Sequence, residues 1–115
     1  MIACIPVLPD GEVAAGWGRA RRVAVAAVAE DRIASWEEAE VGWDVLHDEG
    51  TEGSHHALVA RFLREHHVEV VITEHLGAGM ARMIGSMGIR LVQGAHGDAR
   101  DAVLAVCADR AVGPN

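Results

Sequence analysis

Short apolar runs of strand length are the feature that most limits the folds open to this chain. Residues 2–7, 68–73 and 89–92 are almost unbroken apolar stretches, each followed within four residues by proline, glycine or an acidic residue. Continuous apolar runs of this length are typical of strands that are buried on both faces of a sheet. Between and after them, apolar residues recur every three or four positions, as in helices packed on a sheet. The sequence therefore predicts an α/β domain.

Two further runs, residues 22–29 and 33–41, are separated by Glu30-Asp31-Arg32. This arrangement predicts a β-hairpin. The second run carries three glutamates around Trp36, and such charges discourage pairing with a further strand. We therefore expect this run to form an edge of the sheet.

Three segments show helical spacing, namely residues 58–63, 80–87 and 99–107. Residues 42–53 show no clear periodicity, so we expect a loop there, closed by Ser54 as the N-cap of the first helix. The predicted order is strand, strand, strand, helix, strand, helix, strand, helix. Right-handed crossovers then place the last two strands parallel to the first. We expect a five-stranded mixed sheet in the order 3-2-1-4-5, with residues 2–7 in the middle and three helices flanking it.

A chain of 115 residues can bury one core. We expect a single domain over residues 1–109 and a flexible C-terminal tail over residues 110–115. The formal net charge is −7, which argues against nucleic-acid partners and acidic membrane surfaces. No apolar run approaches the length of roughly 20 residues that spans a bilayer. The N-terminus also lacks the basic region of a signal peptide. We therefore expect a cytoplasmic protein that does not contact membranes.

The sulfur-containing residues are expected to be structural. Cys4 and Cys107 lie in apolar segments without CxxC spacing, which predicts buried, reduced thiols. Met80, Met83 and Met87 share one helix face with Ile84, which favours packing in the core over binding of a soft metal.

Histidines and one glutamate are the candidate metal ligands. Ligands of parallel sheets bind beyond the carboxyl ends of the strands, where Glu74, His75 and His96 would approach one another. Imidazole and carboxylate suit zinc, iron, copper or nickel. The alternative is that His75 and His96 are ordinary solvated loop residues.

Four other histidines are weaker candidates. His55 and His56 could contribute from the first helix, but adjacent helical side chains diverge by about 100° and do not easily chelate one ion. His66 and His67 fit a helix C-terminus, where positive charge is favourable.

Glycine-rich turns and arginines are the candidate anion-binding groups. Gly77-Ala78-Gly79 leads into a helix, whose N-terminal amides attract anions such as phosphate, an oxyanion or a sulfide cluster. The turn at Gly94 also lets backbone amides approach a ligand. Alternatively, these glycines serve only backbone geometry. Arg19 belongs to the basic cluster of this acidic chain and could supply charge to the same anion.

Four segments also match a known family in order and spacing. They are IACIP at the start, GWGRA at Gly16 to Ala20, VEVVITEHLGAGM, and GIRLVQGA at Gly88 to Ala95. In these motifs the chain resembles the dinitrogenase iron-molybdenum cofactor biosynthesis family. The resemblance implies a ribonuclease H-like fold. The family's usual motif places His-Phe before Gly-Arg-Ala, where this chain has Gly16-Trp17.

The resemblance implies a non-enzymatic protein that binds or carries metalloclusters, or that assists in cofactor assembly. Its cargo would be an iron-sulfur or iron-molybdenum cluster precursor, and its partners would be cofactor-assembly proteins or metalloenzymes. The alternative is a scaffold or regulatory interaction domain that has lost ligand binding. The missing motif histidine favours the alternative, whereas the extra histidines favour the carrier.

The sequence lacks the catalytic residues of two enzyme classes that such a fold could suggest. A nuclease needs clustered carboxylates on the central strands to hold two metal ions, but the first strand offers Ala3, Cys4 and Ile5. A nucleophilic hydrolase needs a serine or cysteine beside a base, and no serine here has a nucleophile-elbow context. We therefore expect no enzymatic activity.

Overall fold

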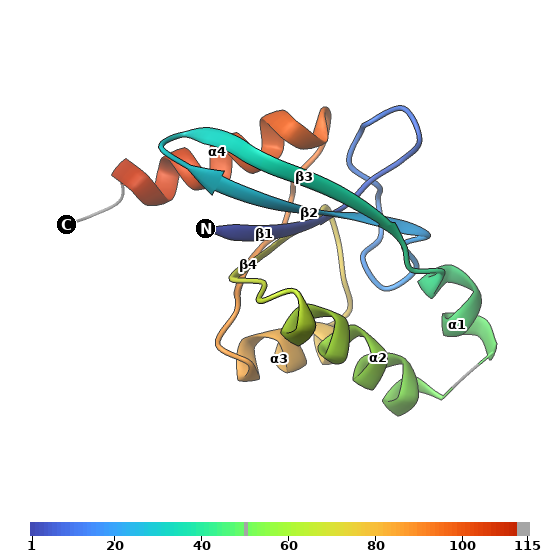
Figure 1. The fold of residues 1–115 in the computed structure, drawn as a ribbon. Helices are drawn as coiled ribbons and strands as arrows, with labels where there is room; N and C mark the ends of the chain where they lie inside the picture. The colour runs from blue at the N-terminus through green and yellow to red at the C-terminus, as the bar shows by residue number, and fades with distance from the viewer. Residues whose placement is uncertain (50, 113–115) are drawn as a thin grey trace.

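A computed structural model of the chain describes residues 1–49 and 51–112 and has an α/β fold (Figure 1). A central sheet lies between helices on both of its faces. The elements in chain order are β1 (Ile2–Pro6), β2 (Arg22–Ala29), β3 (Arg32–Glu40), α1 (Trp43–Glu49), α2 (Glu52–Glu65), β4 (Val70–Ile72), α3 (Ala78–Ser86), β5 (Arg90–Val92) and α4 (Ala99–Val112).

The sheet has five strands in the order β3-β2-β1-β4-β5, as predicted. β1 is central and pairs antiparallel with β2 and parallel with β4. β4 and β5 are also parallel, so the sheet is mixed. This topology directs the loops after β1, β4 and β5 to one end of the sheet.

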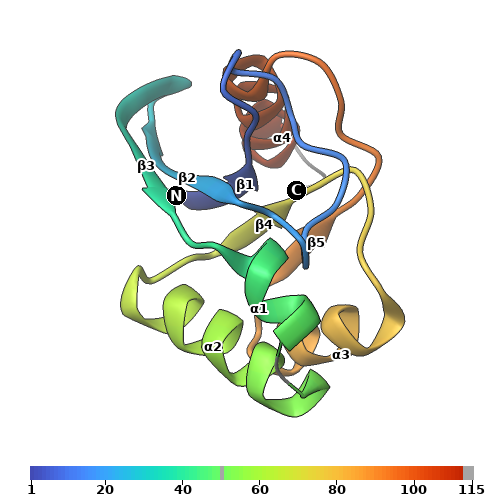
Figure 2. The ribbon, with the colours of Figure 1, turned by 90° about the vertical axis from the view of Figure 1, so that its right-hand side faces the viewer.

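The two faces of the sheet bury two separate apolar clusters. Side chains of successive strand residues alternate between faces, so Ala3 and Ile5 pack with α4 while Cys4 packs with the helices on the other face. Figure 2 shows α4 alone over one face and α1, α2 and α3 over the other. The thiols of Cys4 and Cys107 therefore lie in different clusters, and both are buried as predicted. Burial raises the pKa of the Cys4 thiol.

The hairpin between β2 and β3 closes through the two residues Glu30 and Asp31. Their φ angles are positive, 54° and 62°. A type I′ turn requires positive φ at both of its central residues. β3 forms the edge, which confirms the prediction from its glutamates. The guanidinium carbon of Arg100 on α4 lies 4.5 Å from the ring centroid of Trp36 and so ties α4 to this edge strand.

The expected loop over residues 42–53 is wrong for residues 43–49, which form α1, so four helices flank the sheet instead of three. The helix is held by Trp43, which is 3% exposed and lies 5.1 Å from Trp17 and 5.6 Å from Phe62 between ring centroids. This packing involves residues far apart in sequence, so local periodicity does not reveal it.

The observed bounds of α2 and α4 differ in part from the bounds that the sequence predicted. Thr51, not Ser54, is the N-cap of α2, and its hydroxyl oxygen accepts a hydrogen bond from the Ser54 amide. His66 is the C-cap, in agreement with the prediction for that histidine. α4 continues to Val112, so residues 110–112 are helical, and residues 113–115 lie outside the described residues. Among the described residues, no helix is long and apolar enough to cross a membrane.

Candidate functional site

The loops that follow β1, β4 and β5 meet at one end of the sheet, as the sequence predicted. Gly16 forms a parallel bridge with His75, and the Trp17 amide donates a hydrogen bond of 3.0 Å to the His75 carbonyl oxygen. The Gly94 amide donates to the Glu74 carbonyl oxygen, also at 3.0 Å. The backbone therefore fixes the three loops relative to one another.

Trp17 anchors the first of these loops in the core. Its side chain is 0% exposed and packs against Trp43. The indole N–H has no hydrogen-bond partner among the described residues. Gly16 differs, because a Cβ built there would meet nothing within 4 Å. The Gly16-Trp17 pair thus combines one open position with one fully buried one.

A cavity of about 460 Å³, here called the histidine cavity, lies between this loop and the helices α2 and α3. Its lining comes from three segments that are far apart in sequence. The lining residues are Gly18, His55, His56, Gly77, Ala78, Gly79 and Met80. The predicted Gly77-Ala78-Gly79 segment therefore does border a cavity, together with the two histidines that the sequence ranked low.

His55 connects α2 to the loop after β1. Its side chain is 4% exposed, and its Nε2 atom lies 2.8 Å from the carbonyl oxygen of Gly18. A carbonyl oxygen can only accept, so this bond places the proton on Nε2. While this hydrogen bond persists, Nε2 carries a proton and is not available as a metal ligand. His56 is less buried, and its ring centroid lies 6.0 Å from that of His55.

Gly18 allows the loop to approach these side chains closely. A Cβ at this position would lie 3.5 Å from His55 Cε1 and 3.9 Å from Met80 Cε. Both distances are ordinary van der Waals contacts, so alanine would fit here. A longer side chain would occupy the cavity.

The start of α3 forms the opposite wall of the histidine cavity. Gly77 is the N-cap and makes no side-chain capping bond, and the first turn contains no acidic residue. The first amides of a helix have no partner within the helix. The N-cap residue Gly77 has no side chain that could cap them, so these donors and the positive end of the helix dipole suit an anion.

A second cavity, of about 560 Å³, is here called the arginine cavity. It is lined by apolar residues of the loop after β1 and by Arg19, Arg21, Arg22 and Glu40. Hydrogen bonding to Glu40, with a further contribution from Glu38, raises the pKa of Arg22. Arg19 thus lines a different cavity from Gly77, Ala78 and Gly79. That these residues bind one anion stays a prediction.

The predicted metal ligands Glu74, His75 and His96 are all exposed and line neither cavity. Among the side chains that the structure describes, no three of His, Cys, Asp or Glu gather closely enough to hold a metal ion. The three residues are therefore not a preassembled ligand set. His96 contacts the turn of Gly94 instead, with 3.2 Å between its Nδ1 atom and the Gly94 carbonyl oxygen. The structure does not test whether His75 or His96 binds a metal ion.

The sequence suggested His55 and His56 only as weaker contributors to the candidate site. Their only local signal is that both lie near the start of α2. This part of α2 faces Gly18 because Trp17, Trp43 and Phe62 pack together, and that contact is tertiary.

Comparisons with known proteins agree with the motifs and the topology. Residues 1–109 match the model of a family described as dinitrogenase iron-molybdenum cofactor. The crystal structure of a protein designated PH0822 superposes with a TM-score of 0.76 at 23% identity, over 94% of this chain and 89% of that one. At this identity the likeness shows a shared fold. No curated protein matches the sequence.

Proposed function

The chain belongs to the dinitrogenase iron-molybdenum cofactor family, and from this premise we propose that it binds an anionic metallocluster in the histidine cavity. The family points to the assembly of the iron-molybdenum cofactor. The observation that carries the proposal is the pairing, in one cavity, of two histidines with the uncapped N-terminus of α3. Imidazole supplies a metal ligand, and backbone amides supply donors for an anion.

The two histidines have different roles in this proposal. His56 is the metal ligand because its ring borders the cavity and is less buried. His55 is a positioning residue because its Nε2 atom is engaged by the Gly18 carbonyl oxygen. It holds the loop after β1 against α2 and so keeps one wall of the cavity in place.

The amides at the start of α3 recognise the charge of the cargo. Iron-sulfur and molybdenum-containing clusters carry negative charge on their sulfides, and a helix N-terminus favours such charge. Neither Gly77 nor the first turn of α3 offers a carboxylate that would compete for these amides. The cavity has a volume of about 460 Å³. Small-molecule sites have volumes of roughly 300–1,000 Å³, so the histidine cavity is of suitable size.

We place the protein among carriers and assembly accessories, not among enzymes. In this role it would receive an iron-sulfur or molybdenum-containing precursor and pass it to a cofactor-assembly protein or a metalloenzyme in the cytoplasm. In this proposal the cluster is held by one imidazole and a few amides, so few bonds have to break when it passes to a partner. This property suits a carrier.

A scaffold or regulatory interaction domain is the second candidate function. The observation in its favour is the Gly16-Trp17 pair, where Gly16 offers no side chain and Trp17 is fully buried in the core. A domain of this kind would keep the family fold without its ligand.

Anaerobic reconstitution separates the two functions. The purified chain is incubated with ferrous iron and sulfide, desalted, and examined by absorption spectroscopy and iron analysis. The carrier function predicts visible absorption bands that stay with the protein after desalting. Absence of both bound iron and these bands would favour the scaffold function.

A further inference from the structure

The outer edge of β3 presents unpaired backbone groups. Within the part of the chain that the structure describes, no strand pairs with this edge. Opposite residues of an antiparallel pair alternate between hydrogen-bonded and non-hydrogen-bonded pairs. The Val41 amide donates to the Arg21 carbonyl oxygen at 2.9 Å, so position 41 is bonded toward β2. The alternation then turns the N–H and C=O groups of Trp36, Glu38 and Glu40 outward, where the register with β2 is regular.

An apolar groove of about 320 Å³ lies beside this edge. Its lining includes Ala39 of β3 and Val41 just after it, Leu46 of α1, and Leu58 and Phe62 of α2. Leu46 and Leu58 are 38% and 43% exposed, so the groove offers apolar surface to a partner. We call it the edge groove.

The two sides of β3 differ in the side chains that they present. Ala39 lies opposite Val23, which packs in the cluster under α1, α2 and α3. Glu38 lies opposite Ala24, which packs in the cluster under α4. Successive side chains alternate between faces. A strand added to β3 would follow the same alternation, so its side chains would lie in turn over the edge groove and beside the glutamates on the α4 side.

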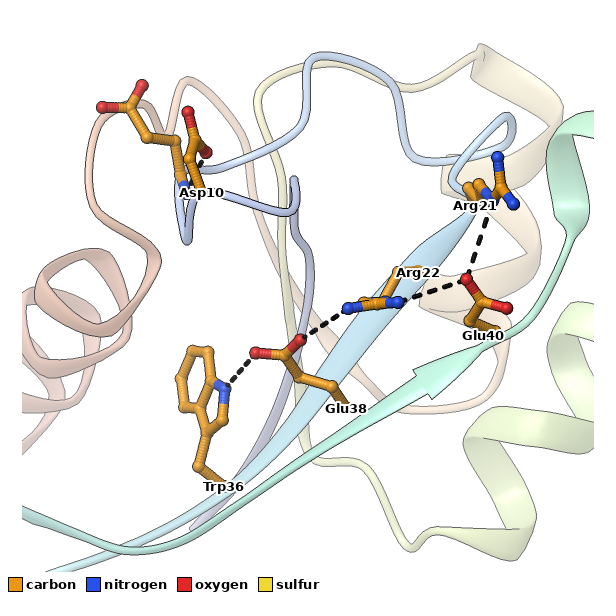
Figure 3. A network of polar contacts seen from close by, with 7 residues as sticks. Asp10, Arg21, Arg22, Trp36, Glu38 and Glu40 are labelled. Carbon is orange, nitrogen blue, oxygen red and sulfur yellow. Dashed lines mark hydrogen bonds and ion pairs between the residues drawn. The ribbon is translucent and has the colours of Figure 1, made fainter.

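These glutamates are held in a series of polar contacts (Figure 3). The indole N–H of Trp36 donates to Glu38 at 3.0 Å. Arg22 lies between Glu38 and Glu40 at 3.4 and 3.2 Å, and Arg21 reaches Glu40 at 3.7 Å. The side chains of Glu38 and Glu40 are 37% and 58% exposed. Because a carboxylate can accept about four hydrogen bonds, both can accept further bonds from a basic side chain.

The charge of this edge selects between possible strands. Glu37, Glu38 and Glu40 are all exposed, and like charges that lie opposite each other across two strands are destabilising. A second copy of the chain that paired through the same edge would bring its own glutamates against these three. A basic segment would instead form pairs of opposite charge, which stabilise a sheet. The net charge of −7 also attracts a basic partner.

We propose that β3 binds an extended segment of a partner protein in which basic residues alternate with aliphatic residues. The backbone of the segment bonds to residues 36, 38 and 40 and extends the sheet by one strand. Its basic side chains contact Glu38 and Glu40, and its aliphatic side chains cover Leu46 and Leu58 in the edge groove. The edge groove shares no lining residue with the histidine cavity, so this inference does not depend on the proposed function.

Fluorescence anisotropy tests the site with a labelled peptide of alternating lysine and valine, long enough to span residues 36–40. We expect saturable binding to the full chain. A peptide with glutamate in place of lysine should not bind. The proposal is overturned if the lysine peptide does not bind, or if the glutamate peptide binds as tightly.

Two isomeric peptides, N-methylated either at every lysine or at every valine, test the backbone pairing. A strand directs the amides of alternate residues to opposite edges, so only one isomer has its methyl groups on the edge that faces β3. We expect this isomer to lose binding and the other to keep it. Equal affinities of the two isomers would contradict pairing with β3.

Leu58→Ser tests the edge groove and should weaken binding of the lysine peptide by about tenfold, the size of one lost apolar contact. Leu8→Ser is the matched control, because Leu8 is also 43% exposed but does not line the groove. Equal affinities of these variants would overturn the proposal. Sedimentation velocity of the chain alone provides a further check, since a dimer that the peptide dissociates would assign the edge to a second copy instead. Circular dichroism confirms that each variant is folded.

Discussion

The Nε2 atom of His55 lies 2.8 Å from the carbonyl oxygen of Gly18 and joins the first turn of α2 to the loop after β1. Because the His55 side chain is 4% exposed, this bond is shielded from water on the histidine side. It links two segments separated by 37 positions in the sequence. The geometry of the histidine cavity depends on this contact.

Replacing His55 by alanine should therefore destabilise the fold. The change removes a buried hydrogen bond and leaves a void, so the free energy of unfolding should fall by about 2 kcal/mol. Urea denaturation followed by circular dichroism measures the loss. The control is the change His56→Ala at the adjacent, more exposed position. It should cost less than His55→Ala, because the His56 side chain is less buried. Equal losses for the two variants would show that the His55–Gly18 bond contributes little.

Gly18 offers a way to fill the histidine cavity without straining the backbone. Alanine fits there in van der Waals contact, whereas leucine extends into the cavity between His55 and Met80. We expect Gly18→Ala to keep most iron binding after reconstitution and Gly18→Leu to lose most of it. Gly16→Leu is the control, because a Cβ at Gly16 meets nothing within 4 Å. Undiminished binding in Gly18→Leu would place the cluster elsewhere.

The buried Cys4 thiol predicts a loss of stability at alkaline pH. Burial raises its pKa in the folded chain above the ordinary value of 9.0, so the unfolded chain releases this proton first as the pH rises. The stabilising contribution is complete below that ordinary pKa and declines above it, by about 1.4 kcal/mol for each further pH unit. The chain contains no lysine or tyrosine, whose titration would overlap.

Denaturation of the wild type and of Cys4→Ala between pH 8 and 10.5 checks this effect. The wild type should lose stability more steeply than the variant. Parallel curves for the two proteins would mean that Cys4 does not titrate differently on unfolding. At neutral pH, a water-soluble thiol reagent should label neither Cys4 nor Cys107 until the chain unfolds.

The turn between β2 and β3 is a place where stability can be gained. Glu30 and Asp31 both adopt positive φ. This conformation costs a non-glycine residue about 1 kcal/mol, whereas Asn-Gly adopts it readily. The double change Glu30→Asn and Asp31→Gly should raise the free energy of unfolding by about 1 kcal/mol. Thermal denaturation measures the gain. An unchanged or lowered melting temperature would show that the turn residues make compensating contacts in the native hairpin.

The sheet could be predicted from the sequence because its signals are local. The apolar run of β1 identified the central strand, and the glutamates of β3 identified an edge. Parallel crossovers then placed β4 and β5 and brought the three loops together. These inferences required only periodicity, charge pattern and handedness.

The site was harder to predict because its assembly depends on tertiary packing. The packing of Trp43 on Trp17 turns an expected loop into α1. The same cluster brings His55 to Gly18, whereas the sequence favoured His75 and His96, which are exposed. Arg19 and the glycines at the start of α3 line different cavities, although both lie in loops at the same end of the sheet.

Iron retention after anaerobic reconstitution, compared between two histidine variants, tests the central claim most directly. One variant is His56→Ala, which removes the proposed ligand in the histidine cavity. The other is His75→Ala with His96→Ala, which removes the two exposed imidazoles outside it. We predict that His56→Ala loses most of the iron bound by the wild type while the double variant retains it. Loss of iron by the double variant, with full retention by His56→Ala, would contradict the assignment of the histidine cavity as the cluster site.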